Sequence, residues 1–475
     1  MNRREFLTGS VALCGLGGCR SLTFGEKPAL RLGILSDLHV STPATTAKFR
    51  RALRYFRSRG ADAVVVAGDL SDYGLKSGLR YVKEAWDAEM AGSGIRPIFI
   101  TGNHDFDGWW YGDITLDMHL NGYSEDEALS RAGMAKCWQE TFGEAFAPVR
   151  MREVNGFRFV TVEWPGEGKS NDAEAVRFLE DHAAELAGPK PFFFVRHVPF
   201  GSTVGGFDRD NGNVLRKALT KFPNAVCLTG HIHWTLLDER SIWQGEFTAV
   251  SVPSMEYTTM PPHHENGCDF RKANSTKGMR LLPARADGKE AQGYFASVHA
   301  DWIVFERHDF EEDVEIAEPW ILPLPLGVRK PYAPDARARC VPVPQFPAGA
   351  DVALRTVNDD TRQGRWTILF ELGFPAASAE GGRVFDYEIR AVAETGRVHA
   401  VKRYLSPAFY KPEGREPARQ AFLFDGMDVP DAEPYHFEIV PRNSFEFAGR
   451  PLRSRTLRSA PGKDISKGIN WRQFQ

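Results

Sequence analysis

The sequence predicts an α/β domain followed by a smaller all-β domain. Between residues 30 and 250, apolar runs such as ADAVVVAGD and KPFFFVRH alternate with helical patterns. Strands that alternate with helices are typical of βαβ units, whose helices cover the faces of a sheet. After residue 348, short β-like runs follow one another with turn residues between them and no helical pattern. That arrangement is typical of a β-sandwich, and 475 residues are enough for both domains.

The first 19 residues predict a targeting signal. Arg3 and Arg4 precede the short apolar stretch SVALCGLGG, and together they resemble a twin-arginine export signal. This stretch is shorter than the about 20 apolar residues that span a bilayer. It ends in LGGC, which resembles a bacterial lipobox with Cys19 as the lipidated first residue; a plain cleaved signal is the alternative. We therefore expect export to the periplasm or cell surface, with membrane attachment through a lipid anchor.

The composition narrows the other possible partners. The formal net charge of −3 gives no reason to expect a nucleic acid partner. The six cysteines include no C-x-x-C pair, which excludes a zinc knuckle or a dithiol redox motif. Nothing in the composition indicates an oligomeric state.

Periodicity places the helices and hairpins of the first domain. The spacing i, i+3, i+4, i+7 predicts a helix that ends at Gly60, and the apolar residues with this spacing are Phe49, Ala52, Leu53 and Phe56. Similar patterns cover residues 75–91, 172–187 and 212–221. The Asn155-Gly156 pair predicts a hairpin turn, and residues 293–310 predict a second hairpin.

Two segments are longer than such a scaffold requires, and long insertions at a catalytic edge often shape substrate pockets. Residues 106–150 include Trp109, Trp110 and Tyr111, which could line a pocket or pack the insertion onto the domain. Residues 254–292 include His263 and His264, for which a surface loop pair is the simpler interpretation.

The proline-rich residues 326–347 predict a linker. The β-sandwich is expected over residues 348–460, followed by a tail at 461–475. Its last runs loosely resemble the late strands of fibronectin type III-like domains.

Five short segments with potential metal ligands each follow an apolar run that predicts a buried strand. In order they are Asp37-Leu38-His39, Gly68-Asp69, Gly102-Asn103-His104-Asp105, His197 and Gly230-His231-Ile232-His233. Open α/β folds carry their chemistry at the edge where the strands end, so we expect these side chains to converge. Carboxylate, imidazole and amide groups together suit two divalent metal ions.

The order D-x-H, G-D, G-N-H-D, H, G-H-x-H resembles the calcineurin-like metallophosphoesterase family over residues 30–325. The resemblance implies an αββα sandwich with two metal ions at one edge. It implies a first metal held by Asp37, His39, Asp69 and His233. It implies a second metal held by Asp69, Asn103, His197 and His231, with Asp69 as the bridge. Manganese, iron and zinc all suit these ligands.

Such a centre makes a phosphate ester reactive toward water. Two metals about 3.5–4 Å apart neutralise the phosphoryl oxygens and lower the pKa of a bound water from about 15.7 toward 7, so that hydroxide can attack. Asp37 and His39 are expected to face the same way on an extended strand end. His104 is expected to contact the phosphate and act as general acid. Asp105 is expected to orient the His104 imidazole, with turn capping as the competing role.

Departures from the family pattern narrow the branch. Purple acid phosphatases have a tyrosine ligand three residues after the bridging aspartate, whereas this chain has Asp72 there, so a tyrosinate–iron centre is not expected. The run GDLSDYG is more similar to the class III phosphodiesterase-like branch. That branch often has a histidine where this chain has Arg196, which could contact phosphate or point away along its strand. Trp109 is a second candidate substrate contact.

The sequence thus predicts a metal-dependent phosphoester hydrolase. A phosphodiesterase acting on a small-molecule or lipid-derived ester is the first interpretation, and a phosphomonoesterase is the alternative within this class. In another class, the chain could be a catalytically inert cell-surface binding protein. The complete ligand set argues against that last interpretation.

Overall fold

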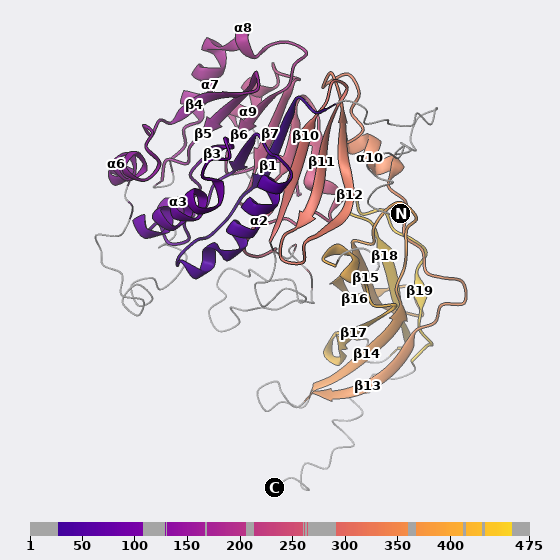
Figure 1. Cartoon of the computed structure of the whole chain (residues 1–475). Coiled ribbons are helices and arrows are strands. Elements are labelled where there is room, and N and C mark those ends of the chain that lie inside the picture. Colours follow the sequence, from indigo (N-terminus) through magenta and orange to yellow (C-terminus); the bar gives the residue numbers. More distant parts are fainter. Residues whose placement is uncertain are drawn as a thin grey trace, which may run out of the picture. The chain divides into compact units, whose positions relative to one another are not determined.

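The computed structural model describes residues 27–107, 129, 131–166, 169–205, 213–259, 261, 264, 291–359, 367–411, 415–429 and 433–457. The chain divides into two compact units (Figure 1). Unit 1 comprises Met1–Thr258 and Asp287–Cys340, and unit 2 comprises Thr259–Ala286 and Val341–Gln475. Within the described ranges, every helix is too short or too polar to cross a membrane.

Unit 1 contains two six-stranded sheets. The first has the order β12-β11-β10-β1-β2-β3, and the second has the order β4-β5-β6-β7-β9-β8. The strands of the first are β1 (Leu30–Leu35), β2 (Ala63–Val66), β3 (Arg96–Phe99), β10 (Gln292–Val298), β11 (Trp302–Asp309) and β12 (Val314–Pro323). Those of the second are β4 (Val149–Val154), β5 (Phe157–Val162), β6 (Phe192–Val195), β7 (Ala225–Thr229), β8 (Ile242–Gln244) and β9 (Thr248–Ser251). Parallel pairing joins β1, β2 and β3 in one sheet and β5, β6, β7 and β9 in the other.

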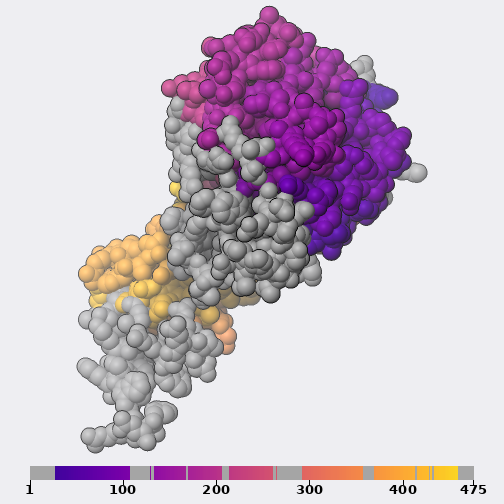
Figure 2. Space-filling model, turned by 90° about the vertical axis from the view of Figure 1, so that its left-hand side faces the viewer, coloured from indigo at the N-terminus to yellow at the C-terminus, as the bar shows by residue number. Residues whose placement is uncertain are grey.

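Helices cover the outer face of each sheet. The first sheet packs against α2 (Ala47–Ser58), α3 (Lys76–Met90) and α6 (Arg131–Phe142). The second packs against α7 (Asp172–Asp181), α8 (Ala183–Leu186) and α9 (Val214–Leu219). Shorter elements are η1 (Ala44–Thr46), α4 (His104–Asp107) and η4 (Glu239–Ser241). In the space-filling view, the part of unit 1 that contains these helices is coloured from indigo to magenta (Figure 2).

Strand β2 shows why its sequence is apolar throughout. Ala63 and Val65 lie in the core between the two sheets, whereas Val64 and Val66 lie in the core between the first sheet and its helices. Both faces of the strand are therefore buried, as is usual for parallel strands covered by helices. The layers follow the order helix, sheet, sheet, helix, and the expected mixed α/β sandwich is confirmed.

The local predictions agree with these elements in most places. The expected hairpins are β4–β5, which turns at Asn155 and Gly156 with positive φ, and β10–β11. The helical pattern over residues 172–187 corresponds to two helices, α7 and α8, that meet at His182.

The expected linker 326–347 contains helix α10 (Pro334–Cys340), which belongs to unit 1. Arg337 of α10 lies 5.1 Å from the ring centroid of Trp320 and donates to the Glu239 carbonyl at 3.1 Å. These contacts explain why part of a proline-rich segment is ordered against the first domain.

Unit 2 contains two sheets that share one core. The three-stranded sheet has the order β13 (Ala353–Asp359), β14 (Thr367–Pro375), β17 (Arg419–Asp425). The four-stranded sheet has the order β16 (Val398–Leu405), β15 (Asp386–Ala393), β18 (Tyr435–Arg442), β19 (Leu452–Arg453). Two short helical turns, η6 (Pro407–Phe409) and η7 (Gly426–Asp428), complete the unit. The prediction of additional strand-rich sheets after the catalytic domain is confirmed.

Candidate metal centre

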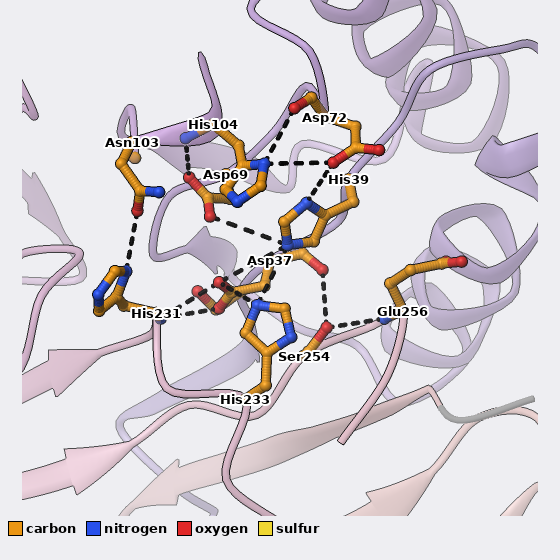
Figure 3. Close-up of polar contacts among 12 residues, drawn as sticks. Asp37, His39, Asp69, Asp72, Asn103, His104, His231, His233, Ser254 and Glu256 are labelled. Carbon is orange, nitrogen blue, oxygen red and sulfur yellow. Dashed lines mark hydrogen bonds and ion pairs between the residues drawn. The ribbon is translucent and has the colours of Figure 1, made fainter. Parts of the chain in front are cut away.

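The five predicted segments converge in unit 1: Figure 3 shows the donors that follow β1, β2, β3 and β7, and His197 contacts Asn103 and Asp69. Asp37 and His39 follow β1, Asp69 follows β2, and Asn103 and His104 follow β3 of the first sheet. The second sheet contributes His197 after β6 and, after β7, His231 and His233. The carboxyl ends of parallel strands from both sheets therefore meet where the sequence predicted.

The backbone at these donors is not extended, which corrects the reason given for their shared direction. A left-handed conformation, with φ between 47° and 72°, is adopted by Asp37, His39, Asp69, His231 and His233. This conformation is unusual for residues with a Cβ atom. The backbone turns sharply after each of these strands. Because of these turns, Asp37 and His39 point into the site together, and so do His231 and His233.

Glycines beside the donors allow the close approach of the loops. A Cβ atom on Gly102 would lie 2.2 Å from Oδ1 of Asp69 and 2.8 Å from Nε2 of His197. A Cβ atom on Gly68, whose φ is 101°, would lie 2.3 Å from Nδ1 of His197. The glycines of the G-D and G-N-H-D segments are thus required because the donor side chains occupy the space that a larger residue would need.

The first group of donors contains Asp37, His39, Asp69 and His233, whose ligand atoms all lie within 4.8 Å of one another. His233 Nε2 lies 3.0 Å from Asp37 Oδ1 and 3.1 Å from His39 Nε2. His39 Nε2 lies 3.8 Å from Asp69 Oδ2. His233 therefore directs Nε2 toward the buried carboxylate of Asp37, and His39 directs Nε2 toward that of Asp69.

The second group is centred on Asn103 and shares Asp69 with the first. Asn103 Oδ1 lies 2.9 Å from His197 Nε2 and 2.8 Å from His231 Nδ1. His197 Nε2 also lies 3.2 Å from Asp69 Oδ2. Asp69 is thus the carboxylate that contacts donors of both groups.

The chemistry of this donor set fits metal ions. Asp37 and Asp69 are 0% and 1% exposed, and each of their recorded ion-pair partners among the described residues is a histidine. Buried carboxylates need a nearby positive charge. Histidine, aspartate and asparagine together form a nitrogen and oxygen ligand set that suits manganese, iron or zinc.

The pKa values in the metal-free chain indicate how its charge is balanced. Burial lowers the pKa of His197, but Asp69 and Asp37 outweigh this effect and raise it to about 9. Burial raises the pKa of Asp69, but His197, His104 and His39 hold it well below its ordinary value. By contrast, burial and the neighbouring His197 lower the pKa of His231 to about 3. Since a metal needs deprotonated ligands, metal binding would displace protons from the histidines of this centre.

Asp72 is a site residue whose role the sequence did not reveal. Its Oδ1 lies 2.9 Å from His39 Nδ1 and 3.3 Å from His104 Nδ1, and its backbone carbonyl lies 3.0 Å from the same His104 nitrogen. A carboxylate on the far nitrogen of a ligand histidine fixes the tautomer and the ring orientation. The signal in the sequence is the position of Asp72 three residues after Asp69, where purple acid phosphatases have a tyrosine ligand.

His104 has the surroundings of a protonated imidazole in the metal-free chain. Burial lowers its pKa, but the carboxylates of Asp69 and Asp72 outweigh burial and raise the pKa to about 9. Its backbone N–H donates to Asp69 Oδ1 at 2.8 Å, which fixes the start of α4 beside the shared carboxylate. With Nδ1 bound to Asp72, Nε2 is the atom through which His104 would donate a proton to a substrate.

The hydrogen bonds of Asp105 favour its turn-capping role over the expected contact with the His104 imidazole. Its carboxylate accepts from the backbone N–H groups of Leu70, Ser71 and Gly102 at 3.2, 2.7 and 2.8 Å. Burial and the nearby Asp69 raise its pKa to about 7, although these amides oppose the shift. Asp105 is therefore the turn-capping residue that the sequence left as an alternative, and it joins the loops after β2 and β3.

The remaining candidates lie elsewhere or outside the described residues. Arg196 lies over the Phe200 ring at 4.5 Å and 3.6 Å from an oxygen of Asp172. His264 bonds to Asp386 of unit 2 at 2.9 Å. Trp109, His263 and Cys19 are outside the described residues.

Comparison with known proteins agrees with the metal centre. The family model for calcineurin-like phosphoesterases matches residues 30–235, a range that contains all of the donors above. No curated protein matches the chain. Similar solved structures include a dimetal phosphatase from Danio rerio, with 12% identity, a TM-score of 0.36 and coverage of 62% of this chain and 99% of that one. They also include a purple acid phosphatase from yellow lupin (Lupinus luteus) seeds, with 14% identity, a TM-score of 0.40 and coverage of 62% and 55%.

The two structural likenesses are too distant to identify a substrate. Residues 30–235 are similar to the calcineurin-like phosphoesterases, and this match and the donor set within it confirm the expectation of a metal-dependent phosphoester hydrolase.

Proposed function

We propose that this chain hydrolyses phosphodiesters at a centre of two metal ions, with phosphomonoesters as the alternative substrates. The observation that carries the proposal is the sharing of Asp69 between two donor groups beside a histidine that is positioned by Asp72. One group would be Asp37, His39, Asp69 and His233, and the other Asp69, Asn103, His197 and His231. Bound manganese, iron or zinc would neutralise the phosphoryl oxygens and supply hydroxide at neutral pH.

The residues of the chain have distinct tasks in this reaction. Asp69 would neutralise charge at both groups, and Asp72 would keep the rings of His39 and His104 in place. Hydrolysis forms a bond from phosphorus to a water oxygen and breaks the bond from phosphorus to the leaving alcohol oxygen. That oxygen would take its proton from Nε2 of His104, a general-acid contribution that is typically worth 10²–10⁴-fold in rate.

The proposed preference for diesters rests on the segment GDLSDYG, which is similar to phosphodiesterase segments and has Asp72 where purple acid phosphatases have a tyrosine ligand. The Asp72 carboxylate contacts two histidine rings, which gives this position a role other than that of a tyrosinate ligand. The direct test is hydrolysis of bis(4-nitrophenyl) phosphate and of 4-nitrophenyl phosphate by purified protein loaded with manganese, with the metal content measured on the same sample. We expect two metals per chain and faster diester hydrolysis. Two bound metals without hydrolysis of either ester would support an inert binding protein instead.

We also propose that the protein is exported and anchored through lipidated Cys19. The proposal is supported by the Arg3-Arg4 pair and the LGGC segment. Wild-type protein should fractionate with membranes and carry acyl chains on Cys19, whereas Cys19→Ser should be processed abnormally. A soluble mature protein that begins at another residue would exclude the anchor.

The proposed role of unit 2 is substrate access or attachment to the cell surface. Its two-sheet core supports a sandwich of fibronectin type III-like character. It contains no catalytic cluster among its described residues that resembles the one in unit 1.

A further inference from the structure

Tyr257 lies beside the metal donors, although no sequence motif indicated it. Its ring centroid is 4.2 Å from that of His233, with 49° between the ring planes. It is 5.9 Å from that of His39, with 31° between the planes. Tyr257 is partly exposed.

The segment that carries Tyr257 is tied to the donor loops. Ser254 Oγ donates to the Asp37 carbonyl at 3.1 Å and accepts from the backbone N–H groups of Glu256 and Tyr257 at 2.9 and 3.3 Å. Lys48 Nζ holds the same segment through the Glu256 carbonyl at 2.9 Å and the Glu256 carboxylate at 3.1 Å. The backbone of Tyr257 is therefore tied to the loop that carries Asp37.

The proton donor and the Tyr257 segment lie on different sides of His39. Figure 3 shows His104 and Asp72 on one side of His39, with Ser254 and Glu256 on the other. The His104 ring meets the His39 ring at 4.5 Å and 82°. A phosphoryl group bound among the donors would thus have the general acid on one side and an aromatic ring toward the other.

We infer that Tyr257 recognises the organic group that stays on phosphorus during diester hydrolysis, and that it selects a planar aromatic group. This inference rests on the proposed phosphodiesterase function. The leaving alcohol must face His104 to receive its proton, so the retained ester group is directed toward the Tyr257 side. An aromatic ring favours stacking or edge contact with another flat ring. A monoester has no retained group and would not use this contact.

Two diesters with the same leaving group test the inference. Bis(4-nitrophenyl) phosphate retains an aryl group, and methyl 4-nitrophenyl phosphate retains a methyl group. The measured quantity is the ratio of their kcat/KM values on the same manganese-loaded sample. Because both substrates report on the same active sites, a partial loss of metal or of folded protein cancels in this ratio.

Tyr257→Leu should lower the aryl-to-methyl ratio about 2- to 12-fold, the equivalent of one aromatic pair of about 0.5–1.5 kcal/mol. Tyr257→Phe should keep the ratio within about twofold, because the ring rather than the hydroxyl makes the contact. The matched control is Tyr81→Leu, since Tyr81 is another partly exposed tyrosine of unit 1, which lies on α3 and packs against the core between the first sheet and its helices.

The outcomes separate the inference from the proposed function. A ratio that falls in Tyr257→Leu alone supports the inference. An unchanged ratio in Tyr257→Leu, or an equal fall in Tyr257→Phe or Tyr81→Leu, overturns it while leaving phosphodiesterase activity established. Wild-type protein that binds two metals and hydrolyses neither diester overturns the proposed function itself.

Discussion

Two buried aspartate clusters in this chain balance their negative charge in different ways. In unit 1, the recorded ion-pair partners of Asp37 and Asp69 are histidines. In unit 2, Asp386 is 0% exposed and accepts from Arg442 at 2.9 Å, Arg403 at 2.8 Å and His264 at 2.9 Å.

The difference indicates which cluster is structural. An arginine side chain stays protonated in proteins and cannot act as a metal ligand, so the charge of Asp386 is neutralised by the chain itself. A histidine can release its proton and offer the same nitrogen to a metal. The unit 1 cluster can therefore exchange protons for metal ions, whereas the unit 2 cluster is complete without them.

The largest expected effect is that of Asp69→Asn. A neutral amide cannot offset the charge of two ions, so both groups should lose affinity, and we expect loss of bound metal and of turnover together. Elemental analysis and diester hydrolysis check this result. Two metals per chain with near-normal turnover would show that Asp69 is not the bridge.

His104→Ala should separate metal binding from proton transfer. We expect kcat to fall by roughly 10²–10⁴-fold, the usual loss for a general acid. The metal content should remain near that of wild type, because His104 is not among the proposed ligands. Loss of metal in this variant would mean that the roles of Asn103 and His104 are misassigned.

Asp386→Ala should affect stability and spare chemistry. Removing one partner of a buried charge cluster typically costs about 3–5 kcal/mol. Hydrogen exchange in peptides from β15 and β18 should accelerate accordingly, while the metal content stays constant. Asp351→Ala, which changes an exposed aspartate of the same unit, provides the matched control. Equal rates of hydrogen exchange in Asp386→Ala and Asp351→Ala would show that the Asp386 cluster has no structural role.

As the pH falls, the unit 1 cluster should lose its metal before the unit 2 cluster loses its contribution to stability. Burial raises the pKa of Asp386, but His264, Arg442 and Arg403 outweigh it and lower the pKa to about 2 from the ordinary 3.8. Its contribution to stability, about 2 kcal/mol, is present above pH 4 and is lost as the pH falls toward 2. Among the proposed metal ligands, His197 has a pKa that Asp69 and Asp37 raise to about 9 against the effect of burial, so it is protonated at higher pH than Asp386. Metal should therefore leave before exchange accelerates in β15, and the reverse order would contradict the comparison.

The smallest expected effect is that of Asp72→Asn. Partners that orient ligand histidines typically contribute about 10–100-fold to affinity or activity. We expect a reduced kcat and weaker metal binding, since Asp72 contacts both His104 and His39. Measuring kcat at saturating manganese distinguishes a loss of catalysis from a loss of metal affinity. Wild-type values for both quantities would mean that Asp72 has no positioning role.

The donors could be predicted from sequence because each directly follows an apolar strand. The side of the sheet and the order of the segments follow from that position alone. Their left-handed backbone could not be predicted, because it depends on contacts between loops, such as those of Gly102 with Asp69 and His197. A sequence shows the strand that precedes a residue but not the side chain that fills the space beside it.

Residues that act by joining distant segments were also missed. Asp72 matters because β1 and β3 bring His39 and His104 to it, and no local pattern encodes that meeting. The sequence places Asp105 next to His104, whereas its carboxylate accepts from backbone amides of another loop and of Gly102. The sequence cannot show that His264 bonds to Asp386, because the two residues are 122 positions apart.

The left-handed backbone of the donor residues also has a consequence for the sequences of related proteins. Each costs of the order of 1–2 kcal/mol relative to a relaxed backbone, and glycine would largely remove that cost. Selection for metal binding opposes such a replacement at His39 or His233. In a lineage that had abandoned catalysis, drift toward glycine at these two positions would increase stability. Glycine there in a related chain would therefore identify a former enzyme, even where the surrounding strands are unchanged.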